Sequence, residues 1–177
     1  QGVDLMVPRG ELTVLLGRNG AGKTTTLRTI MGLWHASRGA LLFDGRDITQ
    51  AATPDISCAG IAYVPENMGI FSDLTVRENS GGQKQMLAIA RAIVEPRKLL
   101  LVDEPTKGLA PAIIQSLITA FRELKAMETT ILLVEQNFSF VKSLGDTVAV
   151  MDDGRIVHSG RMDELAEDRE LQQKLLG

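Results

Sequence analysis

The segment GRNGAGKT, from Gly17 to Thr24, constrains the fold of this chain more than any other feature. It matches the phosphate-loop pattern G-x-x-x-x-G-K-[ST] in full and lies between an apolar run, ELTVLLG, and a stretch of helical periodicity, GKTTTLRTIMGL. Glycines let backbone N–H groups converge on phosphate oxygens, and the following helix adds its positive dipole end. The sequence therefore predicts a nucleotide site formed by Gly17, Arg18, Asn19, Gly20, Ala21, Gly22, Lys23, Thr24 and Thr25.

Within this loop, two side chains have chemical roles of their own. We expect Lys23 to reach the β- and γ-phosphates of ATP or GTP, and the Thr24 hydroxyl to bind Mg²⁺. The second half of such a site is an acid at the end of a neighbouring strand. The segment LLLVDEP supplies Asp103, expected to hold Mg²⁺ mostly through water, and Glu104, placed to orient and deprotonate the attacking water.

Strand and helix patterns alternate along most of the chain. Short apolar runs without polar alternation, such as KLLLVD and TTILLVE, are typical of strands buried on both faces of a parallel sheet. Asp44-Gly45 and Asp153-Gly154 each interrupt two apolar runs and predict hairpins. Helices are expected after Gly22, after Pro111, over residues 137–145 and in the polar tail. We predict a mainly parallel, three-layer α/β fold with ligands at the carboxyl ends of its strands.

Length and composition narrow the class of protein. At 177 residues, 44% of them hydrophobic, the chain fits a single domain, residues 1–177, with a real core. A net charge of −3 argues against non-specific electrostatic binding to nucleic acid. No apolar run is long enough to cross a bilayer. Cys58 is the single cysteine, so an intrachain disulfide is excluded, and we expect it to be half-buried.

The segments SGGQ, KQMLAIARAI and LLLVDEPTKGL together resemble the signature helix and Walker B segment of ABC-transporter ATPase subunits. A helix that begins with bare glycines is an anion site without a lysine of its own. The resemblance implies ATP as the ligand, and two ATPase subunits that close head-to-tail. The nucleotide of one subunit would then be covered by these residues of the other: Ser80, Gly81, Gly82 and Gln83.

Further segments match the same family in order, with three departures. YVPEN falls at the loop that touches the transmembrane permease, with Glu66 at the usual glutamine position near the nucleotide. LLVEQN places Gln136 where most members carry the switch histidine, so we expect a catalytic contact of altered charge. DEPTKGLAP has Ala110 in place of the usual aspartate. Together these segments resemble the ATPases of branched-chain amino-acid importers, which implies a peripheral protein on the cytoplasmic face of the membrane, in a pair of different rather than identical ATPase subunits.

Two parts of the family pattern are missing. Members carry a helical subdomain before the signature, whereas Glu66 and Ser80 are close in this sequence, and Asn79 stands where the signature begins with leucine. We therefore expect a helical segment between Asn79 and Ser80 in the biological chain. The start resembles the middle of the family's small β subdomain, so we also expect its first strand to precede Gln1. Neither Tyr63 nor Trp34 is assigned to the adenine.

Three other functions stay open on the sequence. Close relatives of the importer subfamily serve urea and short amides. A non-transport ABC ATPase acting on nucleic acid or ribosomes would carry a fused second domain or a basic insertion. A nucleotide-binding regulator would not turn over, and Glu104 speaks against it.

Overall fold

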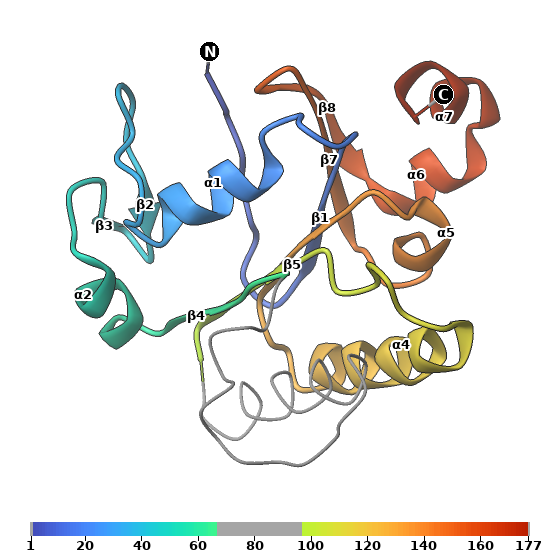
Figure 1. Ribbon diagram of the computed structural model, residues 1–177, viewed down its shortest axis with the longest axis horizontal. Helices are drawn as coiled ribbons and strands as arrows, with labels where there is room; N and C mark the ends of the chain where they lie inside the picture. The colour runs from blue at the N-terminus through green and yellow to red at the C-terminus, as the bar shows by residue number, and fades with distance from the viewer. Residues whose placement is uncertain (1, 67–96, 177) are drawn as a thin grey trace.

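The computed structural model describes residues 2–66 and 97–176, which form a six-stranded sheet with helices on both faces (Figure 1). The strand order in the sheet is β4-β5-β6-β1-β7-β8, with a separate two-stranded hairpin, β2-β3. The strands are β1 (Leu12–Leu16), β2 (Leu42–Phe43), β3 (Arg46–Asp47), β4 (Ile61–Val64), β5 (Leu99–Asp103), β6 (Ile131–Glu135), β7 (Thr147–Asp152) and β8 (Arg155–Arg161). The helices are α1 (Lys23–Ile30), α2 (Thr53–Cys58), α4 (Pro111–Ala126), α5 (Phe138–Val141), α6 (Met162–Glu167) and α7 (Arg169–Leu176).

The first five strands of the sheet order are parallel and only β8 runs antiparallel, on the edge beside β7. Every residue of β1, β5 and β6 is buried. This burial confirms the prediction that their unbroken apolar runs mark strands covered on both faces. The parallel direction matters for function because it brings the carboxyl ends of β1, β4, β5 and β6 to the same edge of the sheet.

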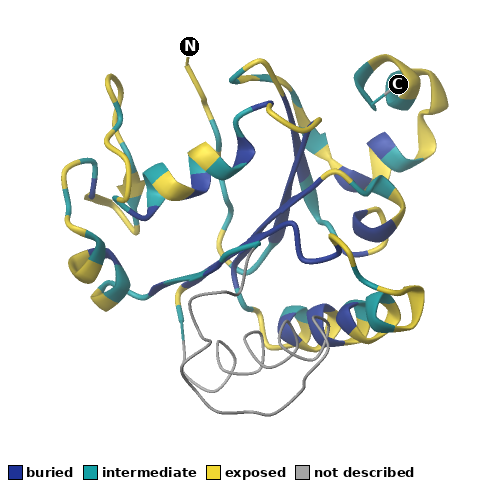
Figure 2. Cartoon of the chain, in the orientation of Figure 1, coloured by how far each residue is buried: buried dark blue, intermediate teal, exposed yellow. Residues whose placement is uncertain are grey.

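Alternate residues of the strands face two separate cores, as strand geometry requires. On one face, Leu12, Val14 and Leu16 of β1 pack with α4, α5 and α6. On the other face, Leu15 of β1 packs with residues of α1 and α2. Figure 2 shows the result as a buried central sheet between helices whose outer surfaces are exposed. The predicted three-layer α/β architecture is confirmed.

Several local predictions are confirmed as well. The hairpins turn at Asp44-Gly45 and Asp153-Gly154, and all four turn residues have the positive φ that such tight turns need. The polar tail is helical, with a break at Asp168 between α6 and α7. The Asp168 carboxylate accepts a hydrogen bond from the Leu171 amide at 2.8 Å and so caps the start of α7.

Three local predictions are wrong or incomplete. The helix expected over residues 137–145 is regular only in α5 and continues as turns to Gly145, whose amide donates to the Val141 carbonyl at 2.9 Å. Helix α2 was not predicted, although Pro54 in its first turn is a typical start signal. Cys58 at the end of α2 is exposed rather than half-buried, since the helix buries Ile56 instead.

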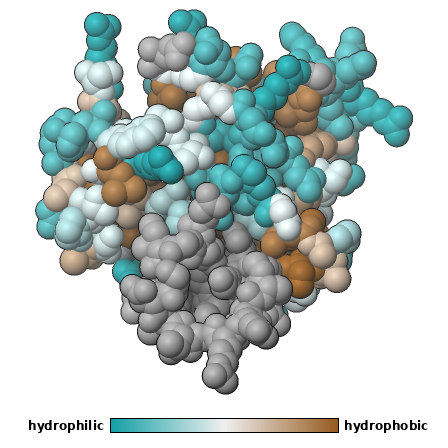
Figure 3. Space-filling view, viewed as in Figure 1, coloured by the Kyte–Doolittle hydropathy of each residue, from teal (hydrophilic) through white to brown (hydrophobic). Residues whose placement is uncertain are grey.

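On the face drawn in Figure 3, the apolar side chains of the described residues are scattered and do not form one large apolar patch. Among the described residues, no helix has both the length and the apolar character that a membrane span requires.

Candidate functional site

The glycine-rich loop connects the end of β1 to the start of α1 and folds around the ammonium group of Lys23. Lys23 Nζ donates to the carbonyl oxygens of Gly17 at 2.8 Å and Arg18 at 2.9 Å, and Lys23 is 4% exposed. A buried ammonium must be compensated, and here the loop's own carbonyl groups supply part of that compensation. Arg18, Asn19 and Gly20 are exposed, so the rim of the loop is open to solvent.

Two glycines of the loop cannot be replaced without strain. Gly22, which precedes α1, has φ +107°, in the region that side chains rarely adopt. Gly17 lies so close to β7 that a Cβ would approach the Met151 carbonyl oxygen to 2.5 Å. The amide of Gly154 in the β7-β8 turn donates to the Ala21 carbonyl at 2.8 Å. The loop is therefore held from behind by the β7-β8 hairpin, which fixes its position at the end of β1.

Asp103 ends β5 and faces the first turn of α1. The Thr24 hydroxyl donates to Asp103 Oδ1 at 3.2 Å and the Tyr63 hydroxyl donates to Oδ2 at 3.2 Å. Burial raises the pKa of Asp103, against the opposing effect of these two hydrogen bonds. Burial, followed by the charge of Asp103, raises the pKa of Tyr63 to about 12, so this hydroxyl keeps its proton and stays a donor. The predicted pairing of Thr24 with Asp103 is thus present in the geometry.

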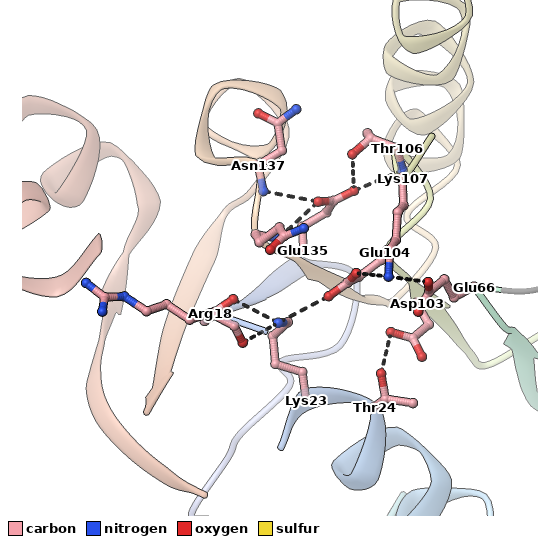
Figure 4. Close-up of polar contacts among 12 residues, drawn as sticks. Arg18, Lys23, Thr24, Glu66, Asp103, Glu104, Thr106, Lys107, Glu135 and Asn137 are labelled. Atoms are coloured by element: carbon pink, nitrogen blue, oxygen red, sulfur yellow. Dashed lines mark hydrogen bonds and ion pairs between the residues drawn. The ribbon is translucent and has the colours of Figure 1, made fainter. Parts of the chain in front are cut away.

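Glu104 is held in an unusual backbone conformation next to Lys23. Its φ is +42°, which costs a residue with a side chain about 1–2 kcal/mol. The strand neighbour compensates, because the Glu104 amide donates to the Val134 carbonyl at 2.9 Å. This geometry directs the carboxylate to the phosphate loop, where Glu104 Oε1 lies 3.2 Å from Lys23 Nζ (Figure 4). Both side chains are almost fully buried, 3% and 6% exposed, so they form a buried ion pair.

A second lysine contacts Glu104 from the other side. Lys107 Nζ lies 2.5 Å from Glu66 Oε1 and 3.8 Å from Glu104 Oε2. The hydrogen bond and charge of Glu66 raise the pKa of Lys107. Figure 4 shows the resulting row of charged groups, from Lys23 through Glu104 to Lys107 and Glu66. Lys107 therefore connects the acid that follows β5 with the acid that follows β4.

Glu135, the last residue of β6, is 1% exposed. Its Oε1 accepts hydrogen bonds from the Thr106 amide at 3.0 Å and the Thr106 hydroxyl at 2.6 Å. Its Oε2 accepts from the amides of Gln136 at 3.0 Å and Asn137 at 3.1 Å. One carboxylate is thus bonded to the turn after β5 and to the turn after β6.

The structure brings some of the predicted site residues together and leaves others apart. Lys23, Thr24, Asp103 and Glu104 form one contiguous cluster. Thr25 and Gln136 are exposed, and the Gln136 backbone amide donates to Glu135 rather than to this cluster. The predicted signature residues Ser80, Gly81, Gly82 and Gln83, with Asn79, lie outside the described residues.

The donors present suit a metal–phosphate ligand. A hydroxyl and a carboxylate oxygen 3.2 Å apart are the hard oxygen ligands that Mg²⁺ takes when substrate phosphates and water complete its octahedron. Within the described ranges, no group of three or more His, Cys, Asp or Glu side chains is placed to hold a metal ion. Thr24 and Asp103 therefore fit a Mg²⁺ that arrives with a nucleotide.

Sequence reasoning left three residues of this cluster without a role: Tyr63, Lys107 and Glu135. Lys107 and Glu135 both lie in segments that match the family pattern, DEPTKGLAP and LLVEQN, next to the positions to which that pattern gives a role. An acid that ends an unbroken apolar strand, parallel to the strand that carries Asp103, was an available signal for Glu135. The contact between the Tyr63 hydroxyl and Asp103 depends on strand register, which no local pattern shows.

Comparison with known proteins agrees with this geometry. The ABC transporter family model matches residues 1–79 and 80–107. Among solved structures, a nucleotide-free ATP-binding cassette from an ABC transporter superposes with a TM-score of 0.83 at 23% identity, covering 99% of this chain and 92% of that one. An ATP-binding subunit of an ABC transporter gives a TM-score of 0.76 at 26% identity, covering 96% and 86%.

Three similar sequences come from transport systems. The high-affinity branched-chain amino acid transport ATP-binding protein BraG of Pseudomonas aeruginosa is 36% identical, over 88% of this chain and 83% of BraG. The probable branched-chain amino acid transport protein LivF of Archaeoglobus fulgidus is 29% identical, over 99% and 91%. The methionine import protein MetN of Pasteurella multocida is 31% identical, over 96% of this chain and 62% of MetN. Since the family model matches more than half of the chain and BraG aligns with most of it, this protein belongs to the ABC transporter family, as an ATPase.

Proposed function

We propose that this chain is the ATP-hydrolysing subunit of an importer for branched-chain amino acids. The similarity to BraG and LivF supports the substrate, and one structural observation carries ATP hydrolysis. The buried Lys23 ammonium lies 3.2 Å from Glu104, beside the Thr24–Asp103 pair, in a glycine-rich loop at the carboxyl end of a parallel sheet. A cation for phosphates, ligands for Mg²⁺ and a carboxylate for water are thus within one cluster, as phosphoryl transfer to water requires.

The roles of individual residues follow from their positions. Backbone amides over residues 17–25 are proposed to hold the phosphate groups, with Lys23 against the β- and γ-phosphates. Thr24 and Asp103 hold Mg²⁺, whose charge offsets that of the phosphates. Glu104 orients and deprotonates the attacking water. Gln136 is proposed to contact the γ-phosphate as a neutral hydrogen-bond donor.

The Lys23–Glu104 ion pair joins the proposed base to the proposed phosphate-binding cation. A triphosphate competes for Lys23 with more negative charge than one carboxylate carries, and it releases Glu104 toward water. Lys107, 3.8 Å from Glu104 Oε2, remains beside the carboxylate after Lys23 turns to phosphate. Hydrolysis is thereby coupled to nucleotide binding through a change of partner.

Assembly is part of the same proposal. Residues 80–83 are proposed to cover the nucleotide of a second ATPase subunit, and Glu66 is placed near the contact with the transmembrane permease subunits. The similarity to both LivF and LivG of Archaeoglobus fulgidus, two different ATP-binding proteins, supports a pair of unlike subunits. Such an assembly would hold the chain on the cytoplasmic face of the membrane.

We also propose that the biological chain carries an additional helical segment between Asn79 and Ser80. The family match is divided between these two residues. The alignment with BraG extends over 193 positions although it covers only 88% of this chain of 177 residues, so BraG contains residues without a counterpart here. The complete gene sequence tests this proposal. A reading frame that runs without interruption from Asn79 to Ser80 would contradict it.

Transport assays test the substrate. The chain, with its permease and binding protein in proteoliposomes, is expected to accumulate leucine, isoleucine or valine when ATP is supplied on the side of the ATPase. Glu104→Gln is the matched control, because it keeps the size and shape of the side chain and removes its negative charge. Uptake of methionine alone would favour a MetN-like importer, which the 31% identity with MetN makes the second candidate. Uptake of urea or an amide alone would also contradict the proposed substrate.

A further inference from the structure

Glu135 is a buried carboxylate that the proposed mechanism does not use. A carboxylate at 1% exposure requires compensation, since an isolated buried charge is costly. Among the described residues, 2–66 and 97–176, no lysine, arginine or histidine forms an ion pair with Glu135. Its charge is instead stabilised by four donors at 2.6–3.1 Å. Such charge-assisted hydrogen bonds are the strong ones in proteins.

The four bonds are divided between two segments that are distant in sequence. Oε1 takes both donors of Thr106, in the turn that follows β5. Oε2 takes the amides of Gln136 and Asn137, in the turn that follows β6. Figure 4 shows Glu135 between the two turns, on the side of Glu104 away from Thr24. We call this set of four hydrogen bonds the Glu135 clip.

The turn after β5 also contains Glu104, two residues before Thr106. Their connection is stiff, because Pro105 lies between them with a fixed φ. The turn is closed by the Lys107 amide, which donates to the Glu104 carbonyl at 3.2 Å. Glu104 itself has a backbone conformation, φ +42°, that persists only when the surroundings impose it. A displacement of Thr106 is therefore passed to the Glu104 carboxylate.

We propose that Glu135 is a positioning residue for ATP hydrolysis. It links the turn that carries Glu104 to the turn that carries Gln136, and so holds both turns in place relative to the phosphate loop. The proposal rests on the proposed function for the reaction that it serves. The link between the two turns is independent of that function and is a property of the nucleotide-free chain.

Amide hydrogen exchange in the nucleotide-free protein tests the link directly. Three of the four donors are backbone amides, those of Thr106, Gln136 and Asn137, so each reports its own bond. Glu135→Gln keeps the shape but replaces one acceptor oxygen with an NH₂ group, which cannot accept from either turn. We expect exchange at least tenfold faster at the amides facing that group, with unchanged exchange in the middle of β6. Unchanged exchange at all three amides would overturn the link.

Turnover and nucleotide affinity separate a positioning role from a structural one. Thr106→Val removes the 2.6 Å hydroxyl bond and leaves the amide bond in place. Thr130→Val is the matched control, because Thr130 is equally buried, 8% exposed, and its hydroxyl oxygen accepts one hydrogen bond, from the Gly10 amide. Thr130 immediately precedes β6, at the end of the strand opposite to Glu135.

We expect Thr106→Val to lower kcat about fivefold and Glu135→Gln about tenfold or more, both with ATP affinity within twofold of the wild type, since one hydrogen bond of this kind is worth about 1 kcal/mol or more. Thr106→Ser, which keeps the hydroxyl, is expected to restore most of kcat. Thr130→Val is expected to lower stability to a similar extent as Thr106→Val with kcat unchanged.

Equal kcat in all four variants and the wild type would overturn the positioning role, even if stability falls. A parallel loss of kcat in Thr130→Val would do the same, because it would trace the loss to general destabilisation. If the wild type binds ATP but does not hydrolyse it, the proposed function fails and the positioning role fails with it. The exchange experiment then still decides whether Glu135 links the two turns.

Discussion

The buried pair of Lys23 and Glu104 gives the most quantitative prediction. Their side chains are 3% and 6% exposed, with 3.2 Å between Nζ and Oε1, so water screens neither charge. Removing one partner of a buried pair leaves the other charge uncompensated and typically costs 3–5 kcal/mol. For Lys23→Met we expect the lower end, about 3 kcal/mol of unfolding free energy, because Lys107 remains 3.8 Å from Glu104 Oε2.

The reverse change is expected to cost less. After Glu104→Gln, Lys23 still donates to the carbonyl oxygens of Gly17 and Arg18, so we expect a loss of about 1 kcal/mol. The double variant Lys23→Met/Glu104→Gln contains neither charge. It should therefore be more stable than Lys23→Met alone, which with single losses of about 3 and 1 kcal/mol corresponds to a coupling free energy of about 2–3 kcal/mol between the two sites.

Urea denaturation without added nucleotide measures the unfolding free energy of all three variants. In a chain of this size a loss of 3 kcal/mol corresponds to a decrease in Tm of about 6–12 °C, which thermal unfolding detects easily. A decrease below about 1 kcal/mol for Lys23→Met would refute the reasoning. So would a double variant whose loss equals the sum of the two single losses, because the two charges would then not interact.

Three further predictions follow from the same cluster. Gly17→Ala should cost about 1–3 kcal/mol and weaken ATP binding, because the new Cβ would lie 2.5 Å from the Met151 carbonyl oxygen; urea denaturation and nucleotide titration check it, and a fully stable variant with normal affinity would contradict it. The raised pKa of Lys107 means that its pair with Glu66 contributes stability that is fully present below pH 10.5 and is lost as the pH rises through the higher folded-state pKa. The wild type should accordingly exceed Lys107→Met in stability at pH 8 and lose that advantage above pH 10.5; a difference that stays constant to pH 12 would refute the pairing. Chelation of Mg²⁺ should abolish ATP hydrolysis and leave weaker ATP binding through Lys23. Turnover assays and titration with ATP, both in EDTA, measure the two effects. Hydrolysis that persists in EDTA would exclude the role given to Thr24 and Asp103.

Much of the fold could be predicted from local sequence because its signals are local. The apolar runs of β1, β5 and β6 are long and uninterrupted, and all three are buried throughout. The hairpin turns at residues 44–45 and 153–154 carry their own conformational signature. One error occurred where tertiary packing decides. Cys58 is exposed because α2 packs Ile56 into the core instead, and no local pattern gives the side of a short helix that faces the sheet.

The candidate site divides in the same way. Lys23, Thr24, Asp103 and Glu104 were found because their motifs have a fixed order and fixed flanking elements, and the structure places them within hydrogen-bond or ion-pair distance. The roles of Tyr63 and Glu135 depend on which strands are neighbours and in which register. The strand order β4-β5-β6 is a property of the folded sheet, so these contacts could not be read from residue spacing.

The central claim is that Glu104 activates the water that attacks ATP bound at Lys23. Single-turnover hydrolysis of Mg²⁺–ATP by the wild type and by Glu104→Gln, with ATP affinity measured on the same samples, tests it most directly. The account predicts a loss of turnover of at least a hundredfold, with ATP bound as tightly as by the wild type or more tightly, because general base catalysis contributes about 10²–10⁴-fold. Undiminished turnover in Glu104→Gln would contradict it.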